Sequence, residues 1–133
     1  MAGVIADTHA VIWYLLDSPR LSTSAQAQFE TCRTEGIRVG VSSISIVEIV
    51  YLVDKDRIPA ETIPLLEEGL EQQPALLEIV PLTQSIALAV RQVPRAQVPD
   101  LPDRVIAATA PHLDVPLISR DRKIKLPDLK TIW

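Results

Sequence analysis

Short apolar runs and longer amphipathic stretches alternate along this 133-residue chain. Runs typical of buried strands occupy residues 3–6, 37–41, 76–80 and 116–119, and residues 130–133 can add a short fifth. Apolar positions recur at helical spacing over residues 8–17, 22–34, 44–53, 60–73, 83–93 and 103–112. Such alternation favours right-handed crossovers between parallel strands. The pattern therefore predicts an α/β fold: three layers, α/β/α, around a central parallel sheet of four to five strands.

Prolines mark the limits of several of these elements. Residues 94–101 are a proline-punctuated loop, and Ser42 and Ser43 supply a helix start. Pro111 is expected to interrupt or end the helix that begins at Asp103. The chain has no internal repeat and no linker, so residues 1–133 are predicted to form a single domain.

Composition narrows the class of protein. Hydrophobic residues make up 47% and charged residues 23%, which is typical of a globular protein. The lone Cys32 rules out an internal disulfide. The sequence shows neither a secretory signal nor an apolar run of about 20 residues, so we expect a cytoplasmic protein without membrane association. A net charge of −4 argues against non-specific coating of nucleic acid, but it does not exclude an enzyme that acts on nucleic acid.

Basic residues are concentrated in the last part of the chain. Two interpretations stay open for this segment: a solvated charged surface, or a patch that steers an anionic substrate. Its members are Arg120, Arg122, Lys123, Lys125 and Lys130.

Four acidic residues occupy positions that ordinary surface charges rarely take. Asp7 and Asp121 each follow an apolar run, Asp103 opens a helix, and Glu48 has aliphatic neighbours on both sides. A buried carboxylate is costly unless a positive group compensates it. The sequence offers no matching set of lysines and arginines, so a divalent metal is the simplest compensator.

The predicted sheet brings three of these acids together. Asp7 and Asp121 lie just past the carboxyl ends of strands, and Glu48 can reach the same edge from the following helix. Asp103 belongs at the opposite end of the sheet unless the loop at residues 94–101 lifts it.

Each acid also has a purely structural explanation. Asp7 could cap the first helix, although Thr8 competes for that role. Asp100 and Asp103 could form an N-cap and N3 pair, and Asp121 could be a turn former. Glu48 could pair with a basic side chain. The set of four nevertheless favours a site for a hard metal ion.

Four segments in sequence order resemble the motifs of PIN-domain nucleases, and more narrowly those of the VapC-type toxins of prokaryotic toxin–antitoxin pairs. They are residues 4–9, 41–49, 103–110 and 117–124, and together they span nearly the whole chain. The resemblance implies a PIN-like fold and a metal-dependent endoribonuclease that uses Mg²⁺ or Mn²⁺. It also implies an RNA substrate, a homodimer, and a cognate antitoxin whose tail covers the acidic pocket.

The resemblance also implies roles for individual residues. Asp7, Glu48, Asp103 and Asp121 match the family's acidic quartet and are the expected catalytic and metal-binding residues, while Thr8 and Ser119 match polar positions beside it. We expect Asp7 and Asp103 to be direct ligands, Glu48 to orient or deprotonate the attacking water, and Asp121 to hold a second ion or a metal-bound water. The roles of Asp100 and of His9, a rival general base or a pocket-lining residue, stay open.

Two other functional classes remain at this point. An aspartyl-phosphate enzyme would use Asp7 as its nucleophile, but the usual second aspartate two positions on is replaced by His9. A non-enzymatic RNA- or protein-binding module with a decayed site is the other class. Apolar stretches at residues 12–16 and 49–53 further predict a surface that meets a partner, with complete burial in the monomer as the alternative.

Overall fold

The computed structural model describes residues 1–122, 124–127 and 129–133, and it has five parallel strands in one sheet. Their order is β3-β2-β1-β4-β5. The strands are β1 (Ala2–Ala6), β2 (Arg38–Ser42), β3 (Leu77–Val80), β4 (Leu117–Ile118) and β5 (Thr131–Ile132). The predicted α/β/α fold with a parallel sheet of four to five strands is confirmed.

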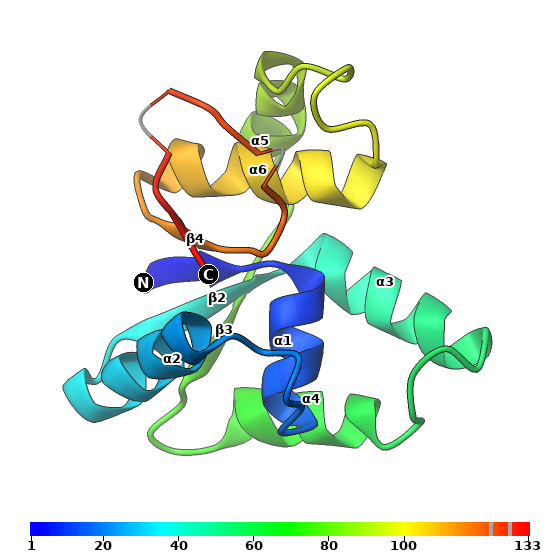
Figure 1. The fold of residues 1–133 in the computed structure, drawn as a ribbon, viewed down its shortest axis with the longest axis vertical. Coiled ribbons are helices and arrows are strands. Elements are labelled where there is room, and N and C mark those ends of the chain that lie inside the picture. The colour runs from blue at the N-terminus through cyan, green and yellow to red at the C-terminus, as the bar shows by residue number, and fades with distance from the viewer. Residues whose placement is uncertain (123, 128) are drawn as a thin grey trace.

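Helices cover both faces of this sheet (Figure 1). Helices α5 and α6 lie on one face, and α1, α2 and α4 lie on the other, with α3 extending to the side. The helices are α1 (Thr8–Leu15), α2 (Thr23–Glu35), α3 (Ser43–Asp54), α4 (Thr62–Glu71), α5 (Gln84–Ala89) and α6 (Leu101–Leu113), with a 3₁₀ turn η1 (Val90–Gln92) after α5.

Strand alternation divides the interior into two cores. Val4 and Ala6 of β1 face the core under α1, α2 and α4, whereas Ile5 faces the core under α5 and α6. In β4, Leu117 and Ile118 divide in the same way. Because successive side chains of a strand point to opposite faces, both faces of this sheet are fully used by apolar packing.

The helix predicted over residues 83–93 and the expected effect of Pro111 differ from the structure. The helix expected over residues 83–93 stops at Ala89 and continues as the 3₁₀ turn η1, after which the Val93 amide donates to the carbonyl of Val90 at 3.0 Å. The Arg104 guanidinium also donates to that carbonyl, at 3.1 Å. Pro111 lies inside α6, which continues to Leu113, since the loss of one hydrogen bond in the last turn is tolerated.

The order in which strands are added to the sheet reverses at β1. After β1 the chain adds β2 and β3 on one side, and it later returns to place β4 and β5 on the other. Ligands on open parallel sheets bind beyond the carboxyl ends of the strands at such a switch point. Here that place lies beyond Ala6 and Ile118. Among the described residues, no helix is long and apolar enough to cross a membrane.

Candidate active site

Asp7 stands at the switch point, directly after β1, and its side chain is buried. Its Oδ1 accepts a hydrogen bond from the Ala10 amide at 2.8 Å, so Asp7 is the N-cap of α1. Burial raises the pKa of this carboxyl, and a hydrogen bond from the Ser119 side chain, the Ala10 amide and the charges of His9 and Arg120 partly offset that effect. The structural explanation of Asp7 as a cap is therefore correct, but it leaves a desolvated carboxylate facing charged neighbours.

Ser119 connects Asp7 with the acid that follows β4. Its hydroxyl donates to the Asp7 carboxylate, and its Oγ accepts from the Asp121 backbone amide at 3.0 Å. Ser119 itself is buried. The residue predicted to lie beside the acids therefore positions two of them.

Asp103 lies in the first turn of α6, close to all the other candidate acids. Its backbone amide donates to Asp100 Oδ1 at 3.2 Å, so Asp100 is the N-cap of the helix. Burial is the largest cause that raises the pKa of Asp103 to about 7, followed by the charges of Asp100, Glu48, Asp7 and Asp121. The loop before α6 therefore does lift Asp103 to the edge that carries the other three.

Glu48 projects from α3, a helix that packs against α6 and α1. Its side chain is half-buried, and Oε1 is the one buried side-chain polar atom among the described residues that has no hydrogen-bond partner. No lysine or arginine in the described part of the chain forms an ion pair with it. A buried polar atom without a partner costs about 1–3 kcal/mol, and more when the group is charged. The arrangement of Glu48 is thus incomplete without a cationic or proton-donating species.

Thr8 supports the site from a distance. Its hydroxyl donates to Ser45 Oγ at 3.0 Å inside the protein, and this bond joins the start of α1 to the first turn of α3. It therefore fixes the helix that carries Glu48 and does not contact an acid. Ser45 was not among the predicted site residues, although a small polar residue within an aliphatic helix was a usable signal.

The donor set suits a hard divalent cation. The candidate ligand atoms are all carboxylate oxygens, which Mg²⁺ and Mn²⁺ prefer. One of them, Glu48 Oε1, is buried without a partner. Across residues 1–122, 124–127 and 129–133, no three acidic, histidine or cysteine side chains form a ready ligand set. Binding would therefore require some side-chain rotation toward the ion.

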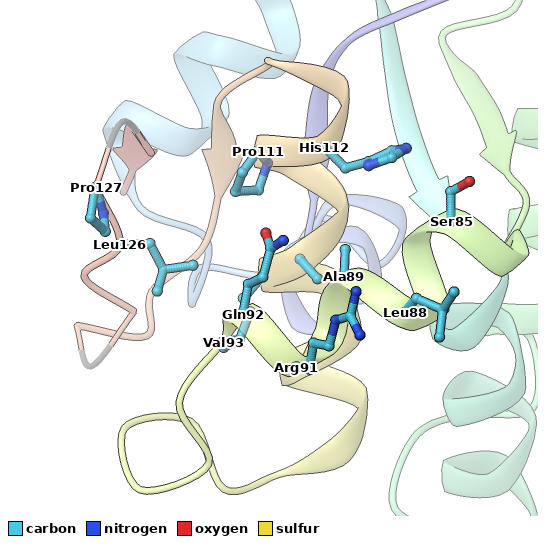
Figure 2. Close-up of a pocket in the computed structure, with 12 residues that line it drawn as sticks. Ser85, Leu88, Ala89, Arg91, Gln92, Val93, Pro111, His112, Leu126 and Pro127 are labelled. Carbon is cyan, nitrogen blue, oxygen red and sulfur yellow. The ribbon is translucent and has the colours of Figure 1, made fainter.

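The cavity of about 440 Å³ shown in Figure 2 lies elsewhere. Side chains of α5, η1, α6 and residues 126–127 line it. The lining includes none of the five acids of the site, which are Asp7, Glu48, Asp100, Asp103 and Asp121. Asp7 and Asp121 instead follow β1 and β4, and Glu48 and Asp103 lie on α3 and in the first turn of α6.

A PIN domain model matches residues 4–129, so the chain belongs to the PIN domain family. The chain is also similar to ribonuclease VapC22 of Mycobacterium tuberculosis, with 29% identity over 136 aligned positions that cover both proteins completely. Both findings confirm the resemblance seen in the sequence motifs.

Solved structures share the same fold. The DNA-bound VapBC of Salmonella typhimurium gives a TM-score of 0.72 at 19% identity, covering 98% of this chain and 97% of that one. VapBC2 of Rickettsia felis, bound to a promoter fragment, gives 0.71 at 18% identity and covers 96% of both chains. FitAcB of Neisseria gonorrhoeae gives 0.65 at 23% identity, covering 96% and 95%.

Proposed function

We propose that this protein is a metal-dependent endoribonuclease and the toxin of a VapBC-type toxin–antitoxin pair. The observation that carries the proposal is the approach of Asp7, Glu48, Asp100 and Asp121 to Asp103, which is close enough for each charge to raise its pKa. Full-length similarity to a VapC ribonuclease supports the choice of RNA as substrate.

The residues divide the work as follows. Asp7 and Asp103 would hold Mg²⁺ or Mn²⁺, and Asp121, whose backbone amide donates to Ser119, would hold a second cation. When bound, such ions neutralise phosphate oxygens and increase the acidity of water. The Glu48 carboxylate, with its partnerless Oε1, orients the attacking water or takes up its proton. Asp100 fixes the start of α6 and thereby the position of Asp103.

Cleavage of RNA is expected to depend on a divalent cation. The purified protein should cut total RNA in Mg²⁺ or Mn²⁺ and lose that activity in excess chelator, because the carboxylates alone cannot neutralise a phosphodiester. Gel analysis of the RNA products is the measurement. Cleavage that persists in chelator, or none with either ion, would contradict the proposal.

Association with copies of itself and with an antitoxin is part of the same proposal. Of the two apolar stretches, that in α1 is largely internal: Ile12 and Trp13 are buried. Helix α3 instead exposes Val47, Val50 and Tyr51, an apolar surface that a partner can cover. The names of the structural neighbours describe VapBC complexes, which supports an antitoxin as one partner.

Light scattering on the isolated chain is expected to report a dimer, since burying this surface of α3 removes apolar area from water. Replacement of Val47 by serine should shift the population toward monomer, whereas replacement of the exposed Thr34 by serine should not. A wild-type monomer at high micromolar concentration would contradict self-association.

A further inference from the structure

A group of aromatic and basic side chains borders the acids, contributed by the first helix and by the segments around β4 and β5. Trp13, buried in α1, is its centre. The Arg120 guanidinium lies 4.8 Å from the centroid of the Trp13 ring, and the Trp133 and His9 rings lie 5.8 Å and 5.5 Å from it. Arg120 and His9 are exposed. We call these four residues the lip.

The lip adjoins the acids directly. The charges of Arg120 and His9 both lie close enough to Asp7 to lower its pKa. Arg120 immediately follows Ser119, whose hydroxyl donates to the Asp7 carboxylate. The basic side chains of the lip therefore border the acidic site on the side of Asp7.

The cation–π contact with Trp13 leaves the Arg120 guanidinium able to bind an anion. A guanidinium that lies over an aromatic ring keeps its N–H donors in its own plane, so they remain available to phosphate oxygens at the side. Among the described residues, no carboxylate oxygen lies within ion-pair distance of Arg120. By contrast, Arg104 donates hydrogen bonds to the backbone carbonyls of Val90 and Val93.

The positive charge of Arg120 reduces the electrostatic repulsion between the acidic site and RNA. The protein has a net charge of −4 and gathers five acids at the site, an arrangement that repels RNA. A preorganised cation beside Asp7 offsets that repulsion where the RNA strand must approach.

We propose that Arg120, placed over the Trp13 ring, binds a backbone phosphate of the RNA at the lip and so positions the strand over the acids. The inference rests on the proposed function and names a substrate-positioning residue for it. His9 adds a second donor on the same side, and Trp133 packs behind Trp13 to keep its ring in place.

Binding of a fluorescently labelled single-stranded RNA, measured by anisotropy in Ca²⁺ at several salt concentrations, tests this directly. Arg120→Ala should weaken binding about tenfold, because a charge-assisted bond to phosphate is lost. It should also reduce the slope of log affinity against log salt by roughly 0.7, the value for one phosphate contact on a single strand. Arg120→Lys should keep the salt slope but lose part of the affinity, because lysine lacks the planar fork.

Arg20→Ala is the matched control, since it removes the same charge from an exposed position after the far end of α1. Cleavage assays on the same proteins should show the Arg120→Ala effect mainly in KM. Equal affinities and salt slopes for Arg120→Ala and Arg20→Ala would overturn the inference, even if the wild type cleaves RNA. RNA binding that depends on Arg120 without any cleavage would keep the inference and remove the nuclease function. Failure of the wild type to bind RNA would overturn both.

Discussion

Replacing Asp7 with asparagine is expected to lower the rate of RNA cleavage by about a thousandfold or more while the protein stays folded. The carboxylate is buried at the switch point of the sheet, where it is a proposed direct ligand of the cation. Metal ions contribute several kcal/mol of transition-state stabilisation, and each 1.36 kcal/mol corresponds to a factor of ten in rate. The fold should persist because asparagine retains an oxygen that accepts from the Ala10 amide.

Initial rates of cleavage in saturating Mn²⁺, together with thermal melting, measure this effect. Asp54→Asn is the matched control, since it makes the same chemical change at the exposed end of α3. Near-wild-type cleavage rates for both variants would contradict the proposed role of Asp7 as a metal ligand. A large loss of stability in Asp7→Asn alone would instead show that its main role is to cap α1.

Replacing Asp103 with asparagine is expected to stabilise the metal-free protein by about 1–2 kcal/mol at pH 8. Burial and four neighbouring acids raise the pKa of Asp103 from 3.8 to about 7 in the folded state. Between those two values the unfolded chain has released the Asp103 proton while the folded chain keeps it, so wild-type stability falls as the pH rises through this window. Asparagine has no proton to lose, and the fall should be smaller in the variant. Solvent screening at this partly exposed side chain limits the effect to this size.

Thermal melting in chelator from pH 4 to pH 8 tests the sign. Wild type and Asp103→Asn should differ least at pH 4 and most at pH 8, and Asp54→Asn should follow the wild type. Added Mn²⁺ should raise the melting temperature of the wild type more at pH 8 than at pH 6, because metal ligands must be deprotonated. A variant that is less stable than wild type at pH 8 would mean that the Asp103 charge stabilises the fold.

Local signals were sufficient for most of the fold. Strand runs such as residues 37–41 and 76–80 were recognised because both faces of a parallel strand are apolar. The change from α-helix to 3₁₀ turn at Val90 was not predicted. The Val90 carbonyl also accepts from Arg104, which lies 14 residues farther along the chain and has no visible link to it in the sequence.

The site divides in a similar way. Residue order alone indicated which carboxylates are unusual, because Glu48 has an aliphatic setting and Asp7 and Asp121 follow apolar runs. It also indicated the sheet edge that Asp7 and Asp121 share, since parallel strands end together there.

The position of Asp103 beside these acids follows from tertiary contacts, because a loop path has no periodic signal and the packing of α6 against β1 and α3 fixes its direction. The same holds for the partnerless oxygen of Glu48 and for Arg120 over Trp13. These features are contacts between residues far apart in the chain, and their energies arise from burial and mutual distance, which residue order does not encode locally.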